Sequence, residues 1–355
     1  MLTRVYIDNF RCFEDFEFRP QSHQLILGGN GSGKSSFMDA LLLLRRFAVE
    51  GDNSGSLFSQ VTVTRWRKPS SQLFEMEVHL DGEEYLYRLL TRSALVLSEA
   101  VELNRQTLFR FAGGEVHTYN DQFELKGKYE LDPNRSALAS MASRPDNVKL
   151  IRFREWFSEL LGFRMNPFAM GARSETADAT PRTDLSNIAA WYRHLRQGDE
   201  QANTALCSSL RESLDGLDVL RAVDAGLNVE ILSAVFHHAT FHFGELSEGQ
   251  RCLIGLYMIL HFLVAKGRTV IIDEPENFIS LREIQPWLMA AADAVEDAGG
   301  QLLLVSHHPE LINQWAPDFG VQFIRENGGA ARVQRFQGDP GSELSPSERI
   351  ARGWE

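Results

Sequence analysis

The segment that most constrains the fold covers residues 25–36 and reads LILGGNGSGKSS. An apolar stretch typical of a buried strand leads directly into Gly28. The spacing from there to Gly33, Lys34 and Ser35 is that of the phosphate-binding loop G-x-x-x-x-G-K-S. Glycines at these positions let several backbone N–H groups turn toward one phosphate. The segment therefore predicts a strand, a phosphate loop and a helix in succession.

Each polar residue of this loop has a chemical reason to be there. Lys34 places a cation against the β- and γ-phosphates, and the Ser35 hydroxyl can coordinate Mg²⁺. A helix predicted from residue 34 to about residue 49 adds the positive end of its dipole. A glycine-rich turn without a ligand is the alternative, and the flanking strand and helix argue against it. The predicted contacts to ATP and Mg²⁺ are Gly28, Gly29, Asn30, Gly31, Ser32, Gly33, Lys34, Ser35 and Ser36.

Composition limits the partners of the chain. Its 355 residues are 43% hydrophobic, which suits one large domain or two lobes. A net charge of −12 argues against a generally basic surface, so any DNA contact needs a local basic patch. Two sequence clusters qualify, and ordinary solvated surface is the alternative for each: Arg65, Arg67 and Lys68, and Lys149, Arg152 and Arg154.

The sequence also predicts a cytoplasmic chain without a membrane segment. Cys12, Cys207 and Cys252 lie far apart and lack metal-ligand spacing, as expected in a reducing cytosol. Charged residues interrupt the first positions, so no signal peptide is expected. The longest apolar run, residues 253–265, is too short to span a bilayer and is interpreted as a buried helix.

The order of the apolar patterns predicts an α/β fold with a mixed central sheet, an antiparallel β lobe and a helical insertion. Alternating residues at 73–80 and 84–90, separated by Asp81-Gly82, are typical of a hairpin. The expected parts are a discontinuous nucleotide-binding core at 1–50 and 244–340, a β lobe at 51–133, a helical insertion with returning strands at 134–243, and a tail at 341–355.

A second motif lies near residue 270. RTVIIDE at 268–274 is typical of a buried parallel strand that ends in two carboxylates, the Walker B pattern. Asp273 would then reach the metal, and Glu274 would orient or deprotonate the attacking water. A core strand followed by an acidic helix cap is the alternative. Together with the phosphate loop, the pattern predicts ATP hydrolysis.

Two further segments complete the set. LSEGQ at 246–250 opens a strongly apolar helix, and Ser247 and Gln250 have the spacing of a capping box. A helix N-terminus is also a natural anion site. The strand expected at 301–305 ends at Ser306-His307-His308.

These motifs occur in the order found in ABC-type ATPase heads, which the chain resembles. LSEGQ is similar to the ABC signature, and the entry NFRCF at 9–13 is similar to the RecF/SMC branch. DEPEN and SHHPEL are most similar to overcoming-lysogenisation-type (OLD-like) AAA ATPases and their relatives in phage defence. The resemblance covers both ends of the chain, and no TOPRIM domain is expected after them.

The resemblance implies roles for individual residues. Ser247 and Gly249 would contact the γ-phosphate of ATP held by a second subunit, with Gln250 close by. His307 would sense the γ-phosphate, and Arg11 matches a basic residue near the nucleotide. Each site then needs parts of two chains, which implies an ATP-dependent homodimer.

The sequence departs from the family pattern in two places. No convincing glutamine loop is present, with Gln60 and Gln122 as weak candidates, and Arg282 replaces an expected acidic residue. The chain is interpreted as an ATP hydrolase acting as an ATP-gated dimer switch, in DNA surveillance or phage defence, with a separate effector protein such as a nuclease. A RecF-like DNA repair ATPase and an ATP-locked scaffold with little turnover stay open as alternatives.

Overall fold

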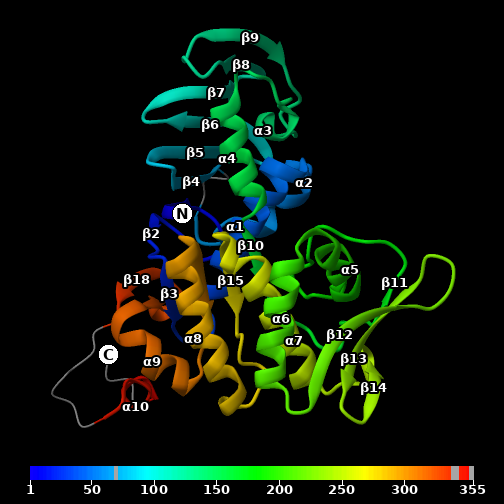
Figure 1. Cartoon of the computed structure of the whole chain (residues 1–355). Helices are drawn as coiled ribbons and strands as arrows, with labels where there is room; N and C mark the ends of the chain where they lie inside the picture. The colour runs from blue at the N-terminus through cyan, green and yellow to red at the C-terminus, as the bar shows by residue number, and fades with distance from the viewer. Residues whose placement is uncertain (68–70, 337–343, 352–355) are drawn as a thin grey trace. The chain divides into compact units, whose positions relative to one another are not determined.

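A computed structural model describes residues 1–67, 71–336 and 344–351 of the chain (Figure 1). The chain divides into two compact units. Unit 1 contains Met1–Leu160 and Trp315–Leu344, and unit 2 contains Leu161–Gln314 and Ser345–Glu348. Lys68 of the first basic cluster and much of the expected tail at 341–355 lie outside the described residues.

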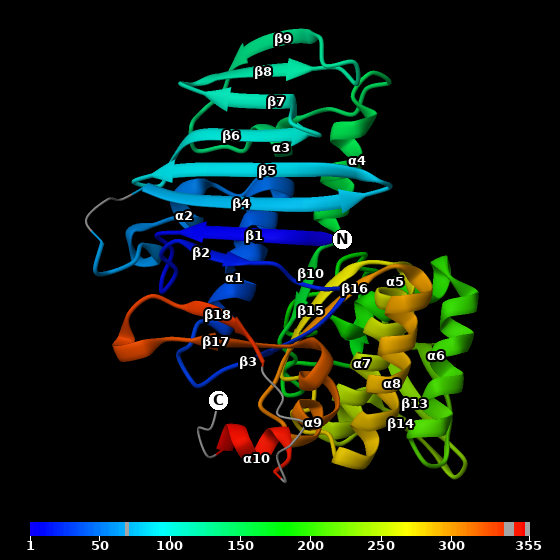
Figure 2. The same cartoon turned by 90° about the vertical axis from the view of Figure 1, so that its left-hand side faces the viewer.

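The main feature of unit 1 is an eight-stranded antiparallel sheet in the order β2-β1-β4-β5-β6-β7-β8-β9. Figure 2 shows its strands side by side as a ladder. Buried and half-buried residues alternate along β4 and β5, because one face of the sheet is packed and the other meets solvent. The strands are β1 (Leu2–Asp8), β2 (Phe16–Phe18), β4 (Ser71–Leu80), β5 (Glu83–Arg92), β6 (Leu95–Leu103), β7 (Gln106–Ala112), β8 (Glu115–Tyr119) and β9 (Leu125–Glu130).

Two-residue turns join the central strands of this sheet. Asp81 and Gly82 have φ angles of 50° and 84°, the left-handed conformation that tight hairpins require. Ser93 and Ala94 adopt φ angles of 49° and 66° without a glycine. Pairing on both sides of this second turn therefore imposes a conformation that its own residues disfavour.

Helix α4 (Val148–Ser158) packs on the sheet of unit 1. The Phe153 ring stacks on Tyr85 with ring centroids 5.6 Å apart, and Phe157 meets the ring of Tyr87 edge-on at 5.5 Å. These aromatic pairs fill the core between helix and sheet. The other helices of this part are α1 (Lys34–Arg45), which continues as the π-helix η1 (Arg46–Glu50), α2 (Ser54–Leu57), η2 (Gln60–Thr62) and α3 (Ala137–Ser140).

Unit 1 also holds the strand that carries the phosphate loop. Strand β3 (His23–Leu27) is buried throughout and pairs in parallel with β17 (Gly320–Ile324). Strand β18 (Arg332–Arg335) pairs antiparallel with β17, and the turn signal Asn327-Gly328-Gly329 lies between them. The short 3₁₀ turn η5 (Glu326–Gly328) lies between the last two strands.

Unit 2 is organised on three parallel strands, β10 (Leu161–Phe163), β15 (Thr269–Asp273) and β16 (Gln301–Val305). Every residue of β15 and β16 is buried, as expected for strands covered on both faces. Helices α7 (Glu248–Phe262) and α8 (Leu281–Ala298) pack together, and the indole N–H of Trp287 in α8 donates to the Leu256 carbonyl at 2.9 Å.

The inserted part of unit 2 contains two helices and a small antiparallel sheet (Figure 1). The pattern of residues 184–196 predicts a helix with Asp184 or Ser186 near its cap, but α5 begins at Ile188, after Leu185 with its left-handed φ of 57°. The boundary between the two units lies within α9 (Pro309–Phe319). The remaining elements are α5 (Ile188–Gly198), α6 (Glu200–Ser213), β11 (Arg173–Ser174), β12 (Leu217–Asp224), β13 (Glu230–Phe236), β14 (Ala239–His242), η3 (Phe243–Glu245), η4 (Val264–Lys266) and α10 (Pro346–Ala351). Among the described residues, no helix combines the length and apolar character needed to cross a bilayer.

Candidate nucleotide-binding site

The phosphate loop of unit 1 lies between β3 and α1, as the sequence predicts. Gly28 and Gly33 have φ angles of 136° and 111°, which favour glycine. A Cβ atom on Gly28 would lie 2.3 Å from the Phe323 carbonyl oxygen, and one on Gly33 would lie 2.9 Å from the sulfur of Cys12. Backbone conformation and close packing therefore both require these two glycines.

The cationic side chain of the loop is folded back onto it. Lys34 is buried, and its ammonium group donates to the carbonyl oxygens of Gly28 at 2.6 Å and Gly29 at 3.2 Å. By contrast, Ser35 is exposed. The loop thus holds its lysine with backbone acceptors, which phosphate oxygens could replace. Of the other predicted contacts, Gly29, Asn30 and Gly31 are exposed, Gly28 and Ser36 are half-buried, and Ser32 and Gly33 are buried.

Two arginines lie close to this loop within unit 1. Arg11 pairs with Asp39 of α1 at 2.5 Å and lies over the Phe10 ring. Arg325 donates to the Gly31 carbonyl at 3.4 Å, and its guanidinium lies 5.4 Å from the centroid of the Trp66 ring. The sequence pattern indicates the first arginine but gives no signal for the second, because the second follows β17 and is nearly three hundred residues away from the loop.

The Walker B strand of unit 2 ends at two carboxylates with different environments. Asp273 is 8% exposed, and its Oδ2 accepts from the Arg164 Nε at 2.9 Å. Glu274 has a left-handed φ of 53°, its N–H donates to the Val305 carbonyl at 2.7 Å, and Asn277 donates to its Oε2 at 2.6 Å. A strained backbone of this kind is typical of functional positions.

A third carboxylate, Glu276, joins the Walker B turn to the end of β16. Ser306 donates to its Oε1 at 2.5 Å, and the His308 N–H donates to the Ser306 hydroxyl at 2.9 Å. Burial raises the pKa of Glu276 above its ordinary value. His307, the predicted γ-phosphate sensor, follows Ser306 directly and is exposed. The turn after β15 and the turn after β16 are therefore linked through buried hydrogen bonds.

The LSEGQ segment begins helix α7 with the expected capping box. The Ser247 hydroxyl accepts from the Gln250 N–H at 3.2 Å, and the Gln250 side chain accepts from the Ser247 N–H at 3.0 Å. A Cβ atom on Gly249 would lie only 2.6 Å from the Phe278 carbonyl oxygen. This glycine is required by packing against the turn after the Walker B strand, a reason that the sequence does not reveal.

Three segments of unit 2 meet at the start of α7: residues 164–168, 246–250 and 273–280, here named the signature cluster. Arg251 of α7 donates to the Pro167 carbonyl at 2.7 Å. The rings of Phe168 and Phe278 meet edge-on with centroids 5.7 Å apart, and both side chains are exposed. The cluster thus brings predicted catalytic and signature residues together on one unit.

The two weak glutamine candidates lie elsewhere. Gln60 starts η2 and Gln122 lies between β8 and β9, both in unit 1 and both exposed. Beside the Walker B strand, β10 instead leads into Arg164.

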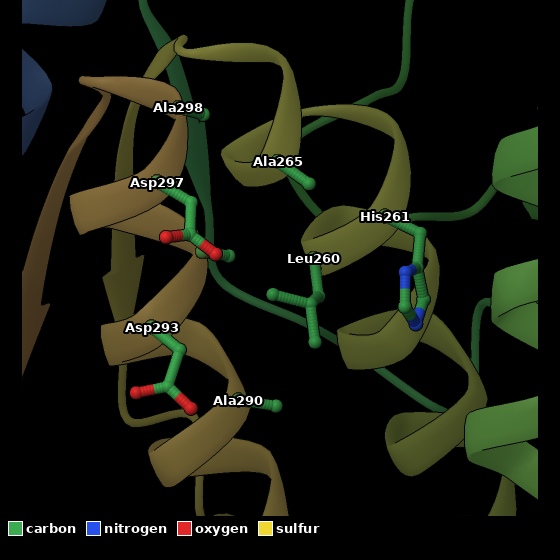
Figure 3. A pocket seen from close by; sticks show the side chains of 8 residues that line it. Leu260, His261, Ala265, Ala290, Asp293, Asp297 and Ala298 are labelled. Atoms are coloured by element: carbon green, nitrogen blue, oxygen red, sulfur yellow. The ribbon is translucent and has the colours of Figure 1, made fainter.

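A pocket of about 430 Å³ lies apart from these motifs, between α7 and α8 (Figure 3). His261 borders it, hydrogen-bonded through Nε2 to the Ser209 hydroxyl at 2.9 Å, and burial lowers the pKa of this histidine to about 4. No predicted site residue lines the pocket, so it is separate from the nucleotide chemistry. Its lining residues are Leu260, His261, Ala265, Ala290, Asp293, Ala294, Asp297 and Ala298.

The chain matches models of known protein families over the segments that carry these motifs. The profile described as "AAA domain, putative AbiEii toxin, Type IV TA system" matches residues 25–313, from the phosphate-loop strand to beyond the Walker B and His307 segments. The profile described as "P-loop containing region of AAA domain" matches residues 2–45. Comparison with curated proteins gives no match.

Solved structures share the fold at low sequence identity. The SMC head domain from Thermotoga maritima is 13% identical with a TM-score of 0.53, covering 95% of this chain and 99% of that chain. The SmcHead bound to the C-winged helix domain of ScpA is 10% identical with a TM-score of 0.58, covering 94% of this chain and 97% of that chain. The predicted α/β P-loop fold is confirmed. This chain belongs to the AbiEii-like family of AAA-type P-loop ATPase domains, with a fold like that of SMC heads.

Proposed function

We propose that this chain is a Mg²⁺-dependent ATPase that works as an ATP-gated dimer switch. Lys34 and the backbone N–H groups of its loop bind the phosphates of ATP. Ser35 and Asp273 hold Mg²⁺, since a hydroxyl and a carboxylate are the oxygen donors that this ion prefers. The Arg164 guanidinium already pairs with the Asp273 carboxylate, which supports this carboxylate as a binding group for a cation. The bound metal offsets the charge that develops on the phosphates.

The residues after β15 and β16 supply the chemistry of hydrolysis in this proposal. Glu274 orients or deprotonates the attacking water, and Asn277 fixes its carboxylate through the bond at 2.6 Å. His307 contacts the γ-phosphate, and Glu276 and Ser306 hold the two turns together. Arg11 is a further contact to the nucleotide.

The observation that carries the dimer is the exposed start of α7. The Ser247 oxygen accepts a hydrogen bond from the Gln250 N–H, so its own hydroxyl hydrogen can be donated to an anion. The helix N-terminus adds favourable potential. We assign Ser247, Gly249 and Gln250 to the γ-phosphate of ATP bound by a second copy of the chain. ATP binding and association are then linked, and hydrolysis separates the copies.

The catalytic assignment is tested with Glu274→Gln. The variant should bind ATP as the wild type does while turnover falls about 10²- to 10⁴-fold, the usual contribution of a general base. Phosphate release and equilibrium ATP binding measure the two effects separately. Wild-type turnover in this variant would rule out the role of Glu274.

The dimer assignment is tested with Ser247→Asp in the Glu274→Gln background. Aspartate caps a helix as well as serine does, so thermal stability should be kept. Its charge repels a γ-phosphate, so the ATP-dependent dimer seen by sedimentation should be lost. Asn53→Asp, which changes the N-cap of α2 in unit 1, is the matched control and should still dimerise. An unchanged dimer in Ser247→Asp would exclude the proposed contact.

For the biological setting we propose cytoplasmic phage defence or DNA surveillance, related to OLD-like ATPases, with a separate effector such as a nuclease. The family description names a toxin of a Type IV system, and the SmcHead structure holds a partner protein, so both support a role gated by another protein. The basic clusters support direct DNA contact less strongly, because Arg67 faces Asp8 at 2.5 Å and Arg152 faces Glu83 at 3.5 Å.

Two alternative functions can be distinguished from this proposal by further measurements. A RecF-like repair ATPase would bind DNA with an affinity that falls steeply with salt. An ATP-locked scaffold would hold a stable protein partner with negligible turnover, whether or not DNA is present.

A further inference from the structure

Strand β10 places one arginine opposite the Walker B aspartate. Its parallel register with β15 pairs Gly162 with Ile271 and Phe163 with Ile272. The next residues in this register are Arg164 and Asp273. The Arg164 backbone N–H donates to the Thr183 carbonyl at 2.8 Å, which fixes the residue just beyond the strand. The fold itself therefore brings these two side chains together.

The pair has the features of charge compensation at a buried group. The Asp273 side chain is 9% exposed and that of Arg164 is 48% exposed, with Nε and Oδ2 separated by 2.9 Å. An ionised carboxylate at the end of a buried strand is costly without a cation or hydrogen-bond donors. Arginine is suited to this position because its guanidinium stays charged and reaches the carboxylate from the solvent side.

A divalent metal and this guanidinium compete for the same carboxylate. Mg²⁺ bound to Asp273 would bring two positive charges next to the one on Arg164, and like charges at such distances repel. Metal binding therefore requires the arginine to move away. The negative charges of a triphosphate offset that repulsion, whereas a free metal ion brings no such charge.

We propose that Arg164 is a positioning residue that holds Asp273 while the nucleotide site is empty and yields to Mg²⁺ delivered with ATP. The inference rests on the proposed function, in which Asp273 receives the metal. Its consequence is a site that resists free Mg²⁺ and responds to Mg²⁺ together with ATP. Arg164 thereby sets the Mg²⁺ requirement of nucleotide binding, apart from any part in hydrolysis.

The test measures melting temperature against free Mg²⁺, with and without ATP, in the Glu274→Gln background. Arg164→Ala should lower the half-saturating Mg²⁺ concentration in the presence of ATP about 3- to 10-fold, the size expected for one competing ion pair. It should also gain a stabilising shift with Mg²⁺ alone that the parent lacks. Arg164→Lys keeps the charge and should stay within about twofold of the parent.

Controls make each outcome decisive. Arg182→Ala removes an exposed arginine of the same unit that hydrogen-bonds Ser186 and should leave the Mg²⁺ response unchanged. If Arg164→Ala fails to fold, Arg164→Gln carries the same expectation, since it removes the competing charge but keeps a donor. An unchanged Mg²⁺ requirement in the neutral variants would overturn the inference while leaving the proposed function intact. A parent protein that shows no response to ATP with Mg²⁺ would instead overturn the proposed function.

Discussion

The phosphate loop of unit 1 and the signature cluster of unit 2 hold their charged groups in different ways. In the loop, Lys34 is held by the backbone carbonyls of Gly28 and Gly29. In the cluster, polar side chains hold one another, as Arg164 holds Asp273 and Asn277 holds Glu274. A site made of backbone depends on local conformation, whereas a site made of side-chain pairs depends on which strands lie together. We therefore expect substitutions to act differently in the two regions.

The largest effect is expected in the loop. Lys34→Ala removes the cation that faces the phosphates and should weaken ATP binding about 100-fold, the scale of a lost charge-assisted bond. Calorimetric titration with Mg²⁺ and ATP measures the affinity. Lys128→Ala, which removes an exposed lysine of the same unit, is the matched control. Equal affinities in the two variants would contradict the loop assignment.

The sheet of unit 1 is a third region for comparison, because it contains a buried carboxylate outside both sites. Glu99 accepts from Tyr87 at 3.1 Å, Ser136 at 2.7 Å and the Ala137 N–H at 2.6 Å. Burial nevertheless raises its pKa from 4.5 to about 7. The folded state thus binds this proton more tightly than the unfolded state does.

The stability from this proton is complete below pH 4.5 and is lost as pH rises through about 7. We expect unit 1 to lose about 2 kcal/mol between pH 5 and pH 8. Glu99→Gln cannot titrate and should flatten that slope, which denaturant unfolding at several pH values would reveal. A slope that persists in the variant would assign the pH dependence to other groups.

In the signature cluster, packing should matter even without nucleotide. In Gly249→Ala the added Cβ would lie 2.6 Å from the Phe278 carbonyl oxygen, which is too close for an undisturbed contact. The substitution should therefore destabilise unit 2 by about 1.5 kcal/mol. Gly244→Ala is the control, because nothing lies within 4 Å of its added Cβ. Thermal unfolding of both variants compares them. Equal stability would mean that the glycine is needed for the ligand alone.

The smallest effect is expected at the helix cap. Ser247→Ala removes the acceptor of the Gln250 N–H and should cost about 1 kcal/mol of stability. Denaturant unfolding without ATP measures this loss of folding stability alone, because no γ-phosphate contact can form. If Ser247→Ala loses no stability, the capping box contributes little. An unchanged stability of Ser247→Asp would then not show that aspartate replaces serine as the cap.

Much of the fold could be predicted where the signal is local. The hairpin at Asp81 and Gly82 follows from residues that favour left-handed backbone, and the buried strand β15 follows from its continuous apolar run. The hairpin turn at Ser93 and Ala94 could not be predicted, because their own preferences oppose it. The pattern at 184–196 likewise favours a helix cap at Asp184 or Ser186, whereas α5 begins at Ile188, after the left-handed Leu185.

The sequence alone determined the phosphate loop, because its strand, glycines, lysine and serine lie within residues 25–36 and act through their own backbone. Only the tertiary structure decided the neighbours of the other motifs. Arg164 and Asp273 are 109 positions apart and meet through parallel strand register. Gly249 meets Phe278 through close packing of a helix start on a turn. Contacts of this kind depend on how distant segments align, which no local pattern of residues encodes.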